Sequence, residues 1–176
     1  MKTFASSDGT RLAYHEKGDG TPLVCLPGGP GRASAYLGDL GGLAAHRRLV
    51  LLDHRGTGDS AVPADPRTYR CDRLVEDVES LRAHLDLARI DLLTHSAAGA
   101  IGTLYAARYP RRIAHLALVA PSWRATGLPF DDEEWLAAIR RRAGESWYAE
   151  AYAAIMRLNE GEVTAANRRA AAPLFF

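Results

Sequence analysis

The chain has 176 residues and is nearly charge-balanced, because 22 Lys and Arg stand against 21 Asp and Glu and give a formal net charge of +1. This balance gives no electrostatic reason to expect a nucleic acid or an anionic membrane surface as a partner. With 47% hydrophobic residues, the chain can bury one ordinary core and a small attached subdomain.

The amino-terminal residues and the cysteine content predict a soluble, cytoplasmic protein. The first ten residues, MKTFASSDGT, lack the apolar core of a signal peptide, and no apolar run approaches the length of a membrane span. Cys25 and Cys71 are too few for a disulfide framework.

Residues 1–122 alternate between short apolar runs and helical patterns, which predicts an α/β fold with a mostly parallel sheet flanked by helices. Apolar runs bounded by Gly, Pro or Asp are typical of strands buried on both faces of such a sheet. The predicted strands are 12–16, 22–26, 49–52, 90–93 and 113–119. The predicted helices are 72–85, capped by Asp72, and 97–109, ended by Pro110.

No strand pattern follows residue 119. Three helices are predicted instead, over 131–143, 146–158 and 164–172, and Asp131 and Glu134 have the spacing of a capping box at the start of the first. The chain therefore divides into an α/β core at 1–122 and a helical segment at 123–176.

Ser96 is the candidate nucleophile. It stands where the predicted strand turns directly into the next helix, a turn that directs a serine side chain above the sheet and in front of a helix N-terminus. This turn usually has glycines two residues before and after the serine, because side chains crowd it, and here these positions hold Thr94 and Ala98. The alternative is an ordinary N-cap serine.

A glycine-rich loop at 26–31, Leu-Pro-Gly-Gly-Pro-Gly, follows another buried strand. Its backbone can approach a ligand closely, and fixed N–H groups are what a developing oxyanion needs. We expect the N–H groups of Gly29 and Ala97 to form an oxyanion hole; the alternative is a plain tight turn.

His54 lies in a third motif, at 53–60, Asp-His-Arg-Gly-Thr-Gly-Asp-Ser, at the carboxyl end of a predicted strand, where α/β proteins build their sites. It is a candidate base. We favour a place in the pocket wall, because its loop also has to structure Arg55 and Asp59.

Together, these motifs resemble the proline iminopeptidase-like branch of the α/β-hydrolases. That family carries His-Gly-Gly-Pro-Gly, then Asp-Gln-Arg-Gly with a nearby Gly-x-Ser, then Gly-x-Ser-x-Gly-Gly before a helix ending in Tyr-Pro or His-Pro. The corresponding stretches here are 27–31, 53–60, 94–99 and 106–110. The resemblance implies the α/β-hydrolase fold, a helical lid after the sixth strand, and cleavage of a small ester, an amide or a short peptide through an acyl-enzyme.

The resemblance also implies roles for the helical segment. Four of its aromatic residues are candidates to line an apolar pocket: Trp135, Trp147, Tyr148 and Tyr152. Two of its acids, Glu145 and Glu150, are candidates to hold a substrate amine. The alternative is that the aromatics pack the lid and the acids face water.

The catalytic acid and base are not found. This fold places them after the serine, in the order acid then His, and the sequence has no histidine after His115. The resemblance implies two further strands, without which strand 113–119 is an unpaired edge. A complementing C-terminal segment or self-association through this edge is then expected. The alternative function is an inactive hydrolase-fold chain that acts at most as a binding module.

No cofactor or metal is expected. The glycine loop lacks the G-x-G-x-x-G order of dinucleotide sites, and no His/Asp cluster has metal-ligand spacing.

Overall fold

A computed structural model describes residues 1–29, 31–122, 132–162 and 164–174. The chain forms two compact units, Met1–Leu128 and Pro129–Phe176. The division falls in segment 123–131, which lies outside the described residues. Asp131 of the predicted capping box lies there too.

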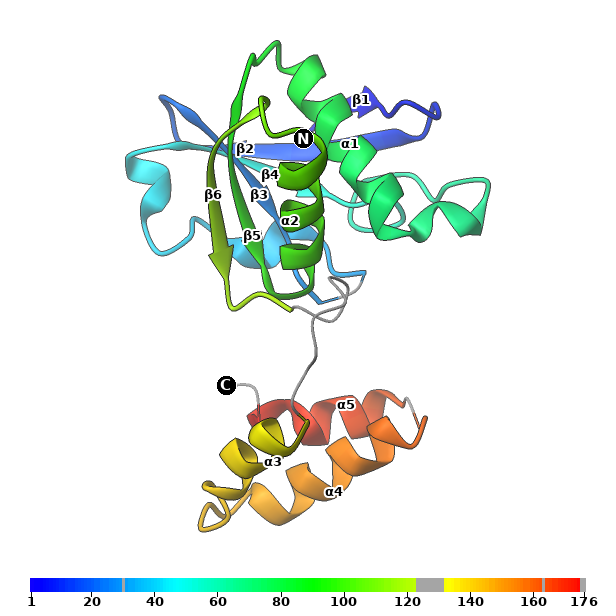
Figure 1. Ribbon diagram of the computed structural model, residues 1–176, viewed down its shortest axis with the longest axis vertical. Helices are drawn as coiled ribbons and strands as arrows, with labels where there is room; N and C mark the ends of the chain where they lie inside the picture. Colours follow the sequence, from blue (N-terminus) through cyan, green and yellow to red (C-terminus); the bar gives the residue numbers. More distant parts are fainter. Residues whose placement is uncertain (30, 123–131, 163, 175–176) are drawn as a thin grey trace. The chain divides into compact units, whose positions relative to one another are not determined.

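The first unit is built on a six-stranded sheet with the order β1-β2-β4-β3-β5-β6 (Figure 1). The strands are β1 Lys2–Ala5, β2 Arg11–Lys17, β3 Pro22–Leu26, β4 Arg48–Asp53, β5 Ile90–His95 and β6 Ile113–Val119. The pairs β1/β2 and β2/β4 are antiparallel, whereas β4, β3, β5 and β6 run parallel. The predicted α/β fold and its five predicted strands are confirmed. The sequence analysis missed β1, which buries only Phe4.

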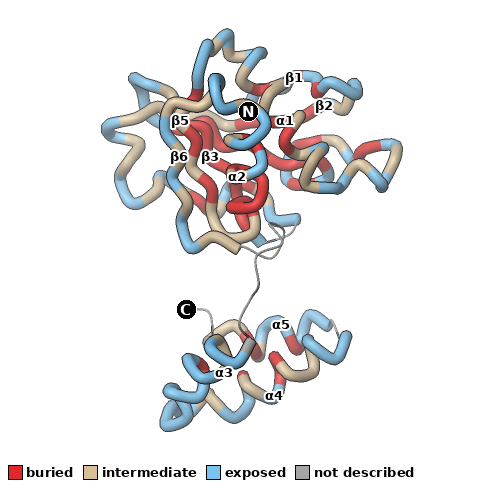
Figure 2. Tube along the Cα trace, viewed as in Figure 1, coloured by how far each residue is buried: buried red, intermediate tan, exposed pale blue. Residues whose placement is uncertain are grey.

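Side-chain alternation along the central strands builds a core on each face of the sheet. Val24 and Leu26 of β3 belong to the cluster that packs against helices α1, Cys71–His84, and α2, Gly99–Arg108. Leu23 and Cys25 belong to a second cluster, on the other face, with the 3₁₀ helix Ser34–Leu37. Burial on both faces explains why these strands read as continuous apolar runs, and Figure 2 shows them as the most buried part of the unit.

Two predicted helix starts are wrong. Helix α1 begins at Cys71 with Arg70 at its N-cap position, so Asp72 is not the cap. Asp72 lies in the first turn, where a carboxylate favours the helix dipole, and it accepts a hydrogen bond from Arg70 Nε at 3.0 Å. Helix α2 begins at Gly99, because residues 96–98 form a separate 3₁₀ turn.

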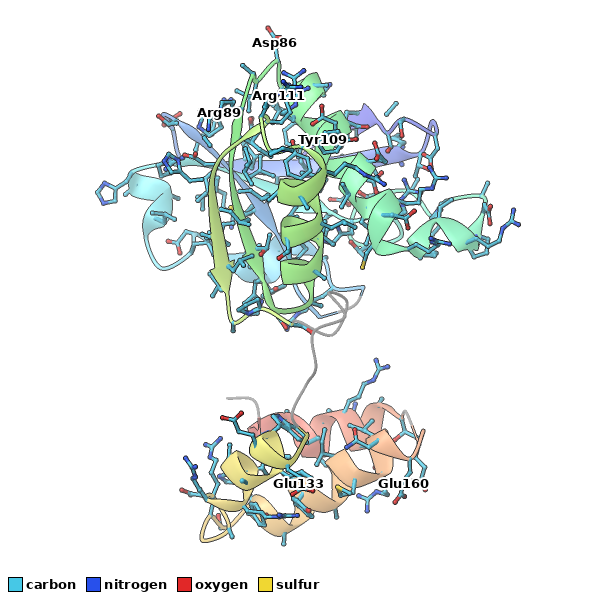
Figure 3. The ribbon with its side chains drawn as sticks, viewed as in Figure 1. Asp86, Arg89, Tyr109, Arg111, Glu133 and Glu160 are labelled. Atoms are coloured by element: carbon cyan, nitrogen blue, oxygen red, sulfur yellow. The ribbon has the colours of Figure 1, made fainter. Side chains whose placement is uncertain are left out.

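Strand β6 is the edge of the sheet, as predicted, and β5 is its one partner among the described residues. Its residues His115, Ala117 and Val119 are exposed (Figure 2). The side chain of Arg89, labelled in Figure 3, donates to the Ile113 carbonyl at 2.7 and 3.1 Å and so fixes the start of this edge.

The second unit consists of helices α3 Asp132–Arg140, α4 Tyr148–Asn159 and α5 Ala165–Ala171. All three predicted helices are present. Thr164 caps α5 by accepting the Asn167 N–H at 3.1 Å, and the Asn167 side chain bonds to Arg157 of α4 at 3.1 Å. Throughout the described ranges, no helix has the length and apolar character needed to cross a membrane.

A buried ion network joins the amino-terminal turn, the loop after β4 and helix α1. Arg55 is only 2% exposed. Its Nε and Nη2 donate to Asp77 at 2.8 and 2.6 Å, and its Nη1 donates to Asp8 at 2.8 Å. The Ser6 hydroxyl adds a further hydrogen bond to Asp77. Because each charge is paired and hydrogen-bonded, burial is tolerated, but loss of one partner leaves the other uncompensated.

We expect Arg55→Met to lower the free energy of unfolding by about 3–5 kcal/mol, because Asp77 would stay buried without its cation. The control is Arg67→Met, which breaks an exposed pair with Asp65 and should leave the free energy of unfolding almost unchanged. Urea unfolding followed by far-UV circular dichroism is the suitable measurement, since all three tryptophans lie after residue 122. Equal losses in the two variants would contradict the role given to this network.

The network also predicts acid sensitivity. Burial raises the pKa of Asp8, but hydrogen bonds from Arg55 and Thr10 outweigh this effect and lower it from 3.8 to about 2. Because the folded-state pKa is the lower one, the stability contributed by the Asp8 carboxylate is full above about pH 4 and is lost as the pH falls towards 2. Asp8→Asn should therefore flatten the dependence of unfolding free energy on pH across this window. Parallel profiles for the two proteins would contradict the assignment.

Candidate active site

Ser96 occupies a strained corner between β5 and α2. Its φ angle is +52°, in the left-handed region that costs a non-glycine residue on the order of 1–3 kcal/mol. The Ser96 carbonyl accepts the N–H of Ser122 at 3.0 Å, which ties the corner to the segment after β6. This is the strand–turn–helix geometry predicted for a nucleophile, and its catalytic role stays a prediction.

The glycine loop packs directly on this corner. A Cβ atom built on Gly28 would lie 2.5 Å from the His95 carbonyl oxygen and 2.7 Å from Ser96 Cβ. These distances are shorter than any van der Waals contact, and backbone atoms have little room to yield. Gly28 is therefore required for the close approach, a constraint that the glycine-rich sequence indicated without identifying the residue.

Thr94, at the first departure from the glycine pattern, is accommodated by a glycine in the next helix. Thr94 is fully buried, and a Cβ atom on Gly102 would lie 2.7 Å from its Cγ2 atom. The room that the Thr94 side chain needs is therefore provided by the missing side chain at position 102. The Thr94 hydroxyl has no hydrogen-bond partner among the described residues.

A cavity of about 400 Å³ opens beside the corner. It brings together three residues predicted from separate motifs, Gly29, His54 and Ala97. Ser96 is not itself among the lining residues, but the two alanines that follow it are. The remaining lining residues include Pro27, Gly28, Gly31, Arg55, Gly56, Thr57, Tyr69, Cys71, Leu74, Ala98 and Ile101.

His54 is buried, and neither ring nitrogen has a hydrogen-bond partner within the described ranges. Burial lowers its pKa, and the negative charges of Asp77 and Asp53 oppose this effect only in part. The imidazole is therefore neutral at pH 7. Its place in the cavity wall agrees with the role we favoured, and no hydrogen bond joins it to Ser96 in the described part of the chain.

Unlike His54, the histidines His95 and His115 have partners of their own. His95 Nδ1 lies 2.8 Å from the Tyr36 hydroxyl, a contact that nothing in the sequence indicated, since 59 residues separate the two. His115 Nδ1 lies 2.7 Å from Asp91 Oδ1, near the start of β5, whereas Ser96 follows its end. Among the described residues, no side chain hydrogen-bonds to the Ser96 hydroxyl, so the structure leaves the base unassigned.

One cluster has metal-ligand composition, although sequence spacing did not reveal it. His15 Nε2 lies 3.1 Å from Asp53 Oδ2 and 3.3 Å from Asp59 Oδ2. Asp53 is already well hydrogen-bonded: its Oδ1 accepts the Ser34 N–H at 2.7 Å and its Oδ2 accepts the Asp59 N–H at 3.0 Å. These contacts hold the loop after β4 in place.

The candidate lid residues are distributed over the second unit. Trp147 and Glu150 line a cavity of about 420 Å³ with Arg169 and Pro173. The Tyr148 ring stacks on that of Tyr152, with centroids 5.5 Å apart. Trp135 packs against the core of the unit, whereas the Glu145 side chain is exposed.

The family model described as the alpha/beta hydrolase fold matches residues 21–158. The chain belongs to the α/β-hydrolase family. Within it, the chain is 33% identical over 128 residues to a proline iminopeptidase of Heyndrickxia coagulans, a match that covers 68% of this chain and 44% of that protein. It is also 33% identical over 139 residues to a (lyso)-N-acylphosphatidylethanolamine lipase of Mus musculus, covering 74% of the chain and 40% of the lipase.

Solved structures give the same family. An α/β hydrolase from Novosphingobium aromaticivorans superposes with a TM-score of 0.60 at 30% identity, over 86% of this chain and 54% of the other. A hydrolase from Pseudomonas aeruginosa superposes with a TM-score of 0.63 at 28% identity, over 98% of the chain and 66% of the other. The chain thus spans less than half the length of the two curated relatives named above.

The packing of Thr94 on Gly102 predicts strong coupling between two substitutions. Gly102→Ala should lower the unfolding free energy by about 1–3 kcal/mol through overpacking, although alanine favours a helix over glycine. In a Thr94→Gly background the same change should cost less, with a coupling energy of about 0.5–3 kcal/mol from the double-mutant cycle. Strictly additive effects in urea unfolding would contradict the proposed compensation.

Proposed function

We propose that this chain carries the nucleophile-bearing part of a serine hydrolase that cleaves ester or amide bonds through an acyl-enzyme at Ser96. The observation that supports it most is the left-handed Ser96 at the corner between strand and helix, next to a cavity that Gly29 and Ala97 line. Similarity to a proline iminopeptidase and to a lipase supports hydrolysis as the reaction class.

In the proposed mechanism, Ser96 Oγ attacks the carbonyl carbon of the substrate and loses its proton to a base. The carbonyl oxygen becomes an oxyanion, which accepts hydrogen bonds from the N–H groups of Gly29 and Ala97. The C–O or C–N bond then breaks, the leaving group takes the proton, and water releases the acyl group. Donors that are already oriented stabilise this charge without reorganisation, an effect worth about 3–4 kcal/mol per donor.

The base and its acidic partner are proposed to come from outside these 176 residues. A serine hydroxyl needs a base to take its proton, and no described side chain bonds to Ser96. The relatives named above are more than twice as long as the segments that match them. A C-terminal segment or a partner chain that pairs with the exposed edge of β6 would bring the missing groups to the same edge of the sheet as Ser96.

The proposed substrate carries an acyl group without a negative charge. Among the described residues that line the cavity, the one cation, Arg55, has its guanidinium committed to Asp77 and Asp8, and His54 is neutral. A small ester, an amide or a short peptide meets this requirement. The second unit is the proposed lid, with Glu150 beside Trp147 as a candidate to hold a substrate amine. We propose a cytoplasmic location and chemistry without a cofactor.

The second candidate is a binding module without turnover. The Ser96 hydroxyl has no side-chain partner in the described part of the chain, which favours this candidate, since a serine without a base is a weak nucleophile. In that case the cavity would bind the same ligands but release them unchanged.

Labelling with a fluorophosphonate probe separates the two candidates. We expect slow labelling of the chain that is lost in Ser96→Ala and kept in the control Ser7→Ala, whose serine is exposed on the amino-terminal turn. Added imidazole should accelerate the labelling, because it supplies the proton acceptor. Labelling that persists in Ser96→Ala would contradict the proposed nucleophile, and no labelling even with imidazole would favour the binding module.

A further inference from the structure

Tyr36 contacts the glycine loop and the strand end before Ser96 at the same time. Its hydroxyl oxygen lies 2.6 Å from the Gly28 N and 2.8 Å from His95 Nδ1. The guanidinium of Arg32, at the far end of the loop, lies 4.2 Å from the centre of the Tyr36 ring. One side chain, carried by the 3₁₀ helix Ser34–Leu37, thus contacts Gly28 within the loop, Arg32 just after the loop, and the residue that precedes the candidate nucleophile.

The chemistry of a phenol limits the direction of these bonds. Its oxygen has one proton to donate and lone pairs to accept. The Gly28 N–H can only donate, so Tyr36 accepts from it and keeps its own proton for a second bond. Where Tyr36 donates that proton to His95 Nδ1, the ring proton of His95 lies on Nε2.

This bridge, in which the Tyr36 hydroxyl contacts both Gly28 and His95, matters because the glycine loop and the Ser96 corner are in direct contact. The Gly28 backbone approaches the His95 carbonyl and Ser96 so closely that no side chain fits between them. The distance between the loop and Ser96 therefore depends on the contacts that hold Gly28. The hydrogen bond from the Gly28 N–H to the Tyr36 hydroxyl is one of these contacts.

The bridge also determines which N–H group of the loop can bind a substrate. The Gly28 N–H is engaged by Tyr36, whereas the next N–H, that of Gly29, makes no hydrogen bond within the described residues. Gly29 has a φ of +54°, in the left-handed region, and it lines the cavity.

We propose that Tyr36 is a positioning residue: its hydroxyl bridges Gly28 and His95, holds the glycine loop on the Ser96 corner, and leaves the Gly29 N–H as the donor that faces the substrate oxygen. The catalytic consequence rests on the proposed function of Ser96. The bridge itself does not depend on turnover, so it can be tested separately.

The test compares the unmodified chain, Tyr36→Phe and the matched control Tyr14→Phe by NMR spectroscopy and by fluorophosphonate labelling. Tyr14 is also a tyrosine whose hydroxyl contacts a histidine ring, His84 Nε2 at 3.4 Å, but it lies on β2. In the unmodified chain, the Gly28 amide should be protected from hydrogen exchange, and His95 should show the tautomer protonated on Nε2. Tyr36→Phe should accelerate exchange of the Gly28 amide at least tenfold and alter the His95 nitrogen resonances, and Tyr14→Phe should do neither.

Labelling adds the functional arm. A misplacement of about 1 Å costs on the order of a hundredfold in rate, so Tyr36→Phe should slow labelling of Ser96 between about tenfold and a hundredfold. An unprotected Gly28 amide in the unmodified chain, or unchanged exchange in Tyr36→Phe, would overturn the bridge even if that variant folds poorly, since the first readout needs no substitution. Unchanged labelling with altered exchange would overturn the positioning role. Failure of the unmodified chain to label would instead count against the proposed function, with the NMR result still deciding the bridge.

Discussion

The buried pair of Arg55 and Asp77 is the interaction on which the geometry of the site depends. It lies between the loop after β4 and helix α1, and Asp8 and Ser6 connect it to the turn after β1. A buried ion pair contributes little net stability compared with apolar packing, but it allows few alternatives, because any arrangement that separates the charges is costly. The loop therefore has one favoured conformation. That conformation brings His54 and Arg55 to the wall of the same cavity as the glycine loop.

The strain at Ser96 is maintained by contacts from several elements. A left-handed residue is unfavourable by itself and persists only where its surroundings over-determine it. Here Gly28 packs against it from the loop, and Ser122 donates to its carbonyl from beyond β6. In the helix behind it, Gly99 has no room for a Cβ atom, which would lie 2.6 Å from Pro121 Cβ. The missing side chains of Gly28 and Gly99 give the turn its space, and the hydrogen bond from Ser122 helps to hold it.

The sequence predicted features that depend on local pattern and missed those that depend on distant contacts. Apolar runs between breakers located β3 and β6 to the residue, and the turn after β5 indicated Ser96. Tyr36 escaped notice because its partners are 8 and 59 residues away, and a tyrosine in a loop has no pattern of its own. Thr94 seemed a departure from the motif until the facing residue, Gly102, could be seen. A sequence motif lies within one segment of the chain, whereas this compensation involves two segments that meet only in the fold.

Under the proposed function, the chain carries one of the two parts of serine-hydrolase chemistry. Stabilisation of the oxyanion needs only backbone donors held in place, and the elements that hold Gly29 and Ala97 lie within one compact unit. Proton transfer needs a base on another strand end. In serine proteases, loss of any triad member still leaves about 10³–10⁴-fold rate enhancement from the oxyanion hole and substrate binding. If Gly29 and Ala97 act as proposed, the first part is useful without the second, and a segment that brings a base to the exposed edge beside β6 completes a site whose donors are already oriented by the fold.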